Sequence, residues 1–331
     1  YISAEADNVL IYVDNEPVED MRIFQSAAYV QNLTEGMHQV HVQKEGLQTW
    51  VKKFPVFAHF VTEAQSFNMP EVPQLRLVTQ YQTPSGASVL FDQKATSTKF
   101  AFASTTNTFF VATTTATSTY VSNTEYAYIK QLVASSTEEK ERIALQQTED
   151  ENIFAFHDDL PIAPVAPTTT VVLATTTKEW NDVRLLEKHG EVYAQWIGKA
   201  ERTPFYYCVS TDSASSTKLK YGTHVYESFV EEHGSTTDPF ETALAVADRF
   251  CRAEIKIDRA WQSVQWFDFM PGSRDHVLMH LQDGVYVVEI DDRAWQNVQL
   301  LYPGYHLEVV LDGERIYIKD DTYYLEVYTE L

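Results

Sequence analysis

The sequence predicts a mainly β protein, in which a small β-sandwich is followed by a β-propeller-like domain of short antiparallel strands. The 331 residues include 19 Tyr and 18 Phe, with abundant Thr, and these residue types favour strands. Short apolar runs alternate with turn residues at intervals of roughly eight to twelve residues, the spacing of sandwiches, barrels and propellers. One nine-residue stretch also occurs twice, which indicates a repeated structural unit.

The first 70 residues predict the small β-sandwich domain. VLIYV at 9–13 indicates a strand, and DNEP at 14–17 consists of turn-forming residues. MHQVHVQKEG at 37–46 alternates in the manner of a half-buried strand, with His38 and His41 on opposite faces. Further strands are expected at 27–33, 47–57 and 59–69.

Residues 32–50, NLTEGMHQVHVQKEGLQTW, together with the preceding Val-Asp turn, resemble the PEGA domain of bacterial surface proteins. The places of that pattern are filled by Asp14, Leu33, Gly36, Val40, Val42, Gly46 and Trp50. Asn15 stands where the pattern has a glycine, and Asn can also adopt positive φ. Residues 25–27, Gln-Ser-Ala, stand where Thr-Pro is common. The resemblance implies a small β-domain on a cell surface.

Residues 71–331 predict the propeller-like domain. PEVPQLRL at 70–77 contains two prolines and is interpreted as a semi-rigid linker. At about 40 to 45 residues per blade, the domain has room for about six blades, with an insertion near 209–250. An open stack of β-meanders or a sandwich is the alternative. Strand-like runs occur at 87–91, 99–103, 108–113, 126–133, 142–147, 152–157, 170–175, 191–198, 204–210, 264–270, 276–281, 284–290, 306–311, 315–320 and 323–328.

Two stretches of this domain have the signals of helices. Residues 136–147, STEEKERIALQQ, begin with a Ser/Thr cap and have Glu in the first turn. Residues 238–251, DPFETALAVADRFC, have Pro near the start, early acidic residues and a late Arg.

The repeated stretch is DRAWQSVQW at 258–266 and DRAWQNVQL at 292–300, identical at seven of nine positions. We interpret it as the joint between two blades. In this interpretation the Asp begins a turn, the Trp packs between units and the Arg pairs with nearby acids; ligand binding by the Arg is the alternative. The residues concerned are Asp258, Arg259, Trp261, Asp292, Arg293 and Trp295.

The C-terminal half carries a second resemblance. EVYAQWIG at 191–198, FYYC at 205–208 and the stretch 266–301 are similar to the propeller-like part of PEGA-domain proteins from candidate-phyla-radiation (Patescibacteria) bacteria. In those proteins a membrane segment typically precedes the PEGA module. The resemblance therefore implies surface anchoring, and it carries over no catalytic residue.

Net charge bears on which partners the chain can have. There are 47 acidic and 25 basic residues, for a net charge of −22. This charge repels phosphate backbones and anionic membrane surfaces, so neither is expected as a partner. The simpler interpretation of the charge is solubility. The chain begins at Tyr1 rather than Met, and we expect an export signal or an anchor to precede it.

The two cysteines, Cys208 and Cys251, do not have metal-ligand spacing. A disulfide in an exported protein is favoured, and two free core thiols are the alternative. The bridge would close the Ser/Thr-rich segment 209–250.

No motif for a nucleophile, a phosphate loop, a metal or a dinucleotide occurs, so no catalytic residue, metal or cofactor is expected. His276 and His280 lie too far apart along a strand to share a metal. The acidic groups at 157–160, 289–293 and 319–324 are interpreted as solvated turn residues, with calcium or carboxylate catalysis as the alternative. The Thr-rich stretch 103–124 suits exposed edge strands, or O-glycosylation.

The expected function is that of a non-catalytic cell-surface structural or binding protein. The PEGA-like module would be a spacer or contact domain, and the propeller-like domain a platform for interaction. The expected partners are an envelope polymer, another surface protein or further copies of the chain. Two alternatives are a carbohydrate-active propeller enzyme with paired carboxylates and an extracytoplasmic sensor or scaffold domain.

Overall fold

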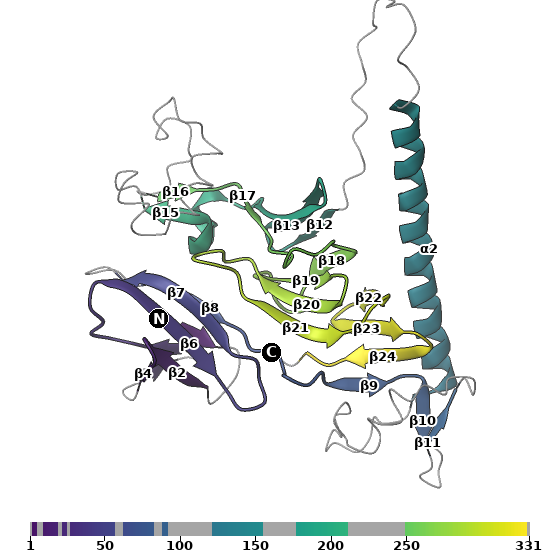
Figure 1. The fold of residues 1–331 in the computed structure, drawn as a ribbon, viewed down its shortest axis with the longest axis horizontal. Helices are drawn as coiled ribbons and strands as arrows, with labels where there is room; N and C mark the ends of the chain where they lie inside the picture. Colours follow the sequence, from purple (N-terminus) through teal and green to yellow (C-terminus); the bar gives the residue numbers. More distant parts are fainter. Residues whose placement is uncertain are drawn as a thin grey trace, which may run out of the picture. The chain divides into compact units, whose positions relative to one another are not determined.

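The computed structural model describes residues 2–4, 9–18, 22–24, 27–56, 62–82, 88–91, 121–154, 177–210 and 249–329. The protein is mainly β, and four of its sheets are four-stranded and antiparallel, none of them closed into a barrel (Figure 1). The chain forms two compact units. The first contains residues 1–74, 177–305 and 329–331, and the second contains residues 75–176 and 306–328. The strands expected at 99–103, 108–113 and 170–175, the acidic group at 157–160 and nearly all of the Thr-rich stretch lie outside the described residues.

The N-terminal part of the first unit consists of two four-stranded sheets. One has the order β4-β5-β1-β8 and the other the order β3-β2-β6-β7. Their strands are β1 (Ile2–Ala4), β2 (Leu10–Val13), β3 (Glu16–Pro17), β4 (Arg22–Phe24), β5 (Ala27–Tyr29), β6 (Gly36–Gln43), β7 (Trp50–Val56) and β8 (Ala64–Ser66). The predicted alternation of β6 is confirmed, because His38 is buried and His41 only half-buried. Asn15 adopts φ 68° in the turn between β2 and β3, as the sequence allowed.

Two more four-stranded sheets, both of them antiparallel, follow in the first unit. One has the order β12-β13-β14-β17 and the other the order β18-β19-β20-β21. Their strands are β12 (Thr177–Trp180), β13 (Val183–Lys188), β14 (Glu191–Trp196), β17 (Glu254–Lys256), β18 (Trp266–Phe269), β19 (His276–His280), β20 (Gly284–Glu289) and β21 (Val298–Pro303). Buried side chains of both sheets, among them Leu185, Phe267 and Met279, share one apolar cluster. This cluster holds the two sheets together.

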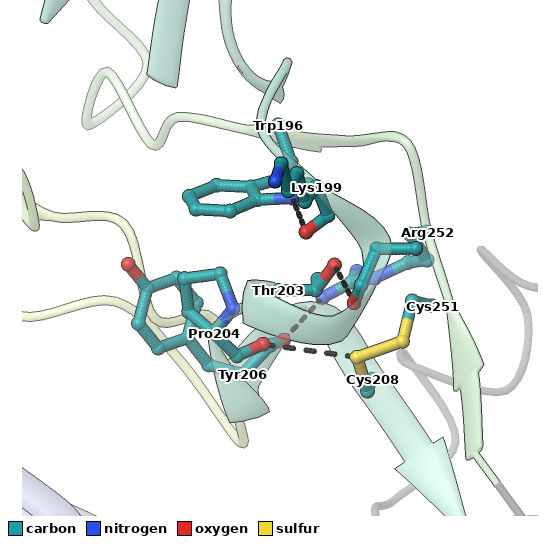
Figure 2. The surroundings of a disulfide bond; sticks show 9 residues. Trp196, Lys199, Thr203, Pro204, Tyr206, Cys208, Cys251 and Arg252 are labelled. Carbon is teal, nitrogen blue, oxygen red and sulfur yellow. Dashed lines mark hydrogen bonds between the residues drawn. A yellow bond between two sulfur atoms is a disulfide. The ribbon is translucent and has the colours of Figure 1, made fainter. Parts of the chain in front are cut away.

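A disulfide joins Cys208 and Cys251, as expected from the sequence. After the 3₁₀ turns η1 (Ala200–Arg202) and η2 (Phe205–Tyr207), the cysteines pair across β15 (Cys208–Ser210) and β16 (Arg249–Cys251). Figure 2 shows the bridge with Trp196, Tyr206 and Arg252 nearby. The helix predicted at 238–251 is wrong for residues 249–251, which form β16; the rest of that stretch lies outside the described residues.

The second unit contains the sheet β22-β23-β24-β9. Its strands are β22 (Glu308–Asp312), β23 (Arg315–Asp320), β24 (Tyr323–Val327) and β9 (Leu75–Leu77), and β10 (Gln80–Gln82) pairs with β11 (Ser88–Leu90). The interpretation of 70–77 as a linker is thus wrong for its last three residues, which are hydrogen-bonded to β24. Tyr126, Ile129 and Val133 of α2 (Asn123–Phe154) belong to the same apolar cluster as Tyr317 of β23.

Helix α2 confirms the helix predicted at 136–147 and extends it in both directions. The strands predicted at 126–133, 142–147 and the first part of 152–157 are therefore wrong. Within the described ranges no helix has both the length and the apolar character needed to cross a membrane.

The two copies of the repeat occupy different places in the sheets. Residues 258–266 connect β17 of one sheet to β18 of the next, whereas residues 292–300 connect β20 and β21 within a single sheet. The interpretation as a joint between successive units is wrong for the second copy. Nearly the same sequence thus forms two different connections.

Candidate functional site

The second copy of the repeat binds the main chain of the N-terminal part. Trp295 Nε1 donates to the carbonyl of Val51 at 3.0 Å, and the Val51 N–H donates to Asn297 Oδ1 at 3.2 Å. Gln299 accepts from the Met69 N–H at 2.6 Å and donates to the carbonyl of Phe67 at 3.1 Å. Alternate residues of this copy thus bind main-chain groups of the edge strand β7 and of the segment after β8.

Behind these contacts lies a group of buried polar side chains around Glu289. Lys52 is fully buried, and its Nζ lies 2.5 Å from Glu289 Oε1 and 2.5 Å from the carbonyl of Asp291. Trp50 Nε1 donates to Glu289 Oε2 at 3.1 Å. Asn297 donates to Glu289 Oε1 from its backbone N at 2.7 Å and from Nδ2 at 2.8 Å. Burial raises the pKa of the Glu289 carboxyl despite the neighbouring Lys52.

The two aspartates that follow are also buried and paired. Asp291 binds the guanidinium of Arg293, which lies over the rings of Phe54 and Phe205 at 4.7 and 4.4 Å. Asp292 binds both terminal nitrogens of Arg252 at 2.7 and 2.6 Å. Burial alone would raise the pKa of Asp291, but Arg293 and Lys52 outweigh it and hold this pKa below its usual value. The interpretation of 289–293 as solvated turn acids is wrong.

The first copy of the repeat forms an exposed turn. Gln262 N donates to the carbonyl of Arg259 at 2.9 Å, and the two central residues, Ala260 and Trp261, have φ of 48° and 62°. This is the pattern of a type I′ turn, which strongly prefers Asn-Gly at these places because both residues have positive φ. An aromatic residue in the left-handed region is a genuine outlier.

The indole of Trp261 is 98% exposed, and no hydrogen bond or ring contact links its side chain to another residue in the described part of the chain. The expectation that Trp261 packs between units is wrong. Its counterpart Trp295 is 38% exposed and bonded to β7. Ser263 and Gln265, the counterparts of Asn297 and Gln299, are exposed as well. The residues that bind main-chain groups in the second copy thus have exposed counterparts in the first copy.

Side-chain hydrogen bonds of Arg259 and Gln262 fix the exposed turn to other residues of the first unit. Arg259 donates to both carboxylate oxygens of Glu191 at 2.8 and 2.9 Å and to the carbonyl of Gln262 at 2.5 Å. Gln262 Oε1 accepts from the backbone N–H of Gln282 and Asp283. The hydrogen bond to Glu191 raises the pKa of Arg259, so the guanidinium stays charged. Both repeat arginines therefore pair with carboxylates.

The remaining aspartate of the repeat joins the two copies. Asp258 N donates to Gln296 Oε1 at 2.6 Å, and Asp258 Oδ1 accepts from the Ala260 N–H at 2.8 Å.

Local sequence signals identified the repeat but not the exposed turn, because Ala-Trp is not a sequence expected to form this turn.

Among the described residues, no three His, Cys, Asp or Glu side chains gather closely enough to hold a metal ion. Comparison with protein-family models, with curated proteins and with solved structures finds no match.

Proposed function

We propose that this chain is a non-catalytic extracytoplasmic binding protein that contacts its partner through the Trp261 turn. The observation that carries the proposal is an indole that is almost fully exposed although its backbone conformation is unfavourable. Unfavourable backbone geometry persists where the surroundings impose it, and it concentrates at functional sites. Aromatic side chains supply much of the binding energy in protein contacts. The partner is an envelope polymer or another surface protein.

Two other features support the remainder of the proposal. The disulfide is compatible with an oxidising, extracytoplasmic compartment. The two N-terminal sheets would form the PEGA-like sandwich, and the later four-stranded sheets would form the propeller-like platform. Strand β9, from the start of the predicted platform, completes the last sheet beside β24.

The test is co-sedimentation of the purified, oxidised chain with an envelope fraction of the source cells. We expect saturable binding, and Trp261→Ala should weaken it about tenfold or more, the loss typical of an anchor side chain. Tyr305→Ala is the matched control, because Tyr305 is also an exposed aromatic residue of the same unit.

Two outcomes would overturn the proposal. Equal binding by the Trp261→Ala chain would exclude the turn as the contact. A wild-type chain that stays monomeric at high concentration and binds no envelope fraction would exclude the binding function itself.

A further inference from the structure

We propose that Lys52 and Asn297 become joined by an isopeptide bond inside the folded chain, with Glu289 as the group that transfers the protons. The amine, the carboxamide and the carboxyl are all buried. Lys52 Nζ and Asn297 Nδ2 both lie within hydrogen-bond distance of one oxygen, Glu289 Oε1, at 2.5 and 2.8 Å. One carboxyl oxygen thus contacts both the attacking nitrogen and the leaving nitrogen.

The carboxamide of Asn297 is arranged as an electrophile. Its Oδ1 accepts the N–H of Val51 at 3.2 Å, and this donor would stabilise the negative charge that develops on the oxygen when an amine attacks the carbon. Its Nδ2 faces the carboxyl that would protonate it. The side-chain carboxyl of Asp291 is another acyl group near the amine, and its Oδ1 lies 3.5 Å from Lys52 Nζ. Arg293 keeps Asp291 ionised, and a carboxylate is a poor electrophile.

The carboxyl of Glu289 is suited to proton transfer. Burial raises its pKa, so it can accept a proton from the Lys52 ammonium more readily than an exposed glutamate can. Trp50 Nε1 fixes the other oxygen at 3.1 Å, which leaves Oε1 directed at the two nitrogens. A buried lysine whose amine has been deprotonated is a competent nucleophile.

The reaction balances without any co-reactant. Glu289 takes one proton from the Lys52 ammonium, and the neutral Nζ attacks Cγ of Asn297. The tetrahedral intermediate collapses as Glu289 returns a proton to the Nδ2 nitrogen, and the bond from Cγ to Nδ2 breaks. A new amide forms between Nζ and Cγ, and ammonia leaves. The second proton that the Lys52 nitrogen must lose goes to this ammonia, which therefore leaves as an ammonium ion.

The bond would fasten β7 of the N-terminal sheets to the second copy of the repeat, across a long stretch of chain. Cross-links that close long loops restrict the unfolded state most. The same contacts without the bond form an ordinary buried ion pair, so the covalent product must be detected directly.

The experiment is intact-mass spectrometry of the full chain after reduction, followed by sequencing of its tryptic peptides. We expect the wild-type mass to be lower than the sequence mass by one ammonia, and a branched peptide that joins Lys52 to Asn297. Glu289→Gln and Lys52→Arg should have the full mass calculated for their own sequences. Gln299→Ala is the matched control, because it removes another side chain of the same contact and should still lose ammonia.

The result on the wild-type chain decides the question even where a variant fails to fold. Full sequence mass in the folded, aged wild-type chain would overturn the proposal. Loss of ammonia without a branched peptide would also overturn it. Loss of one water, with a branch from Lys52 to Asp291, would show a different bond and overturn the assignment to Asn297.

Discussion

Arg252 and Asp292 form a buried ion pair in which each side chain supplies the countercharge of the other. We expect Arg252→Met to lower the free energy of unfolding by about 3–5 kcal/mol, because Asp292 is then left buried without its countercharge. The double variant Arg252→Met/Asp292→Leu should recover most of the loss. Urea unfolding measures both effects.

The control for this prediction is the exposed pair of Arg184 and Glu179. Its loss in Arg184→Met should change the free energy of unfolding by no more than about 1 kcal/mol. A single Arg252 variant as stable as the wild type would contradict the account of the buried pair.

His276 makes stability depend on pH. It is buried beside Ser273 Oγ at 2.6 Å, and burial together with Lys52 lowers its pKa from 6.5 to about 3. The native state therefore keeps the ring neutral while the unfolded chain protonates it, so this residue favours unfolding increasingly as pH falls from about 6.5 towards about 3.

Between about pH 7 and about pH 4.5, the wild type should lose about 3 kcal/mol more than His276→Gln does. Comparing the two chains by urea unfolding removes the effect of other titrating groups. Equal losses in both chains would show that His276 is not held neutral.

Residue by residue, the sequence could predict partners only where they are local. It indicated that Arg259 and Arg293 pair with acids, and both do. It did not reveal the burial of Asp292, because its partner Arg252 lies far away in the sequence. Nor did it reveal the burial of Asp291, which pairs with the nearby Arg293 but also lies beside the distant Lys52. A run of acids preceding a turn has the same local appearance whether it is solvated or buried.

At the scale of elements, the turn Arg259–Gln262 exposes Trp261 and lowers the free energy of unfolding, because its two central residues have positive φ. Replacing Ala260-Trp261 by Asn-Gly should raise the free energy of unfolding by about 1–2 kcal/mol, because these residues adopt positive φ at lower cost. The same change should weaken envelope binding as strongly as Trp261→Ala does. Ala260→Asn alone is the control, since it should gain part of the stability and keep the binding. A destabilised Asn-Gly chain would show that Trp261 supports the fold instead.

Helix α2 shows how a strand prediction fails within a helix. Tyr126, Ile129 and Val133 are strand-favouring residues, yet their spacing of three and four places them on one helical face. Ser122 begins the helix, because its Oγ accepts the N–H of Glu125 at 3.1 Å. Ser-x-x-Glu is a capping signal that the sequence contained at 122–125. Strand alternation elsewhere, as in β6, was predicted correctly.

At the scale of the whole molecule, each unit is assembled from segments far apart in the sequence. Strand β9 pairs with β24 across almost the whole later chain. Periodicity can identify such strands, but it contains no information on which distant strand becomes the neighbour. This is why most strands of the C-terminal half were predicted and their grouping into two units was not.

This assembly predicts how a truncated chain behaves. All six tryptophans belong to the first unit, whereas α2 belongs to the second. Removing residues 321–331 deletes β24, so β9 loses its partner and the cluster that holds α2 opens. A helix without tertiary packing is marginally stable. We therefore expect the helical circular-dichroism signal to fall, while tryptophan fluorescence still reports a cooperative urea transition. An unchanged helical signal, or loss of the fluorescence transition as well, would contradict the division into two units with separate cores.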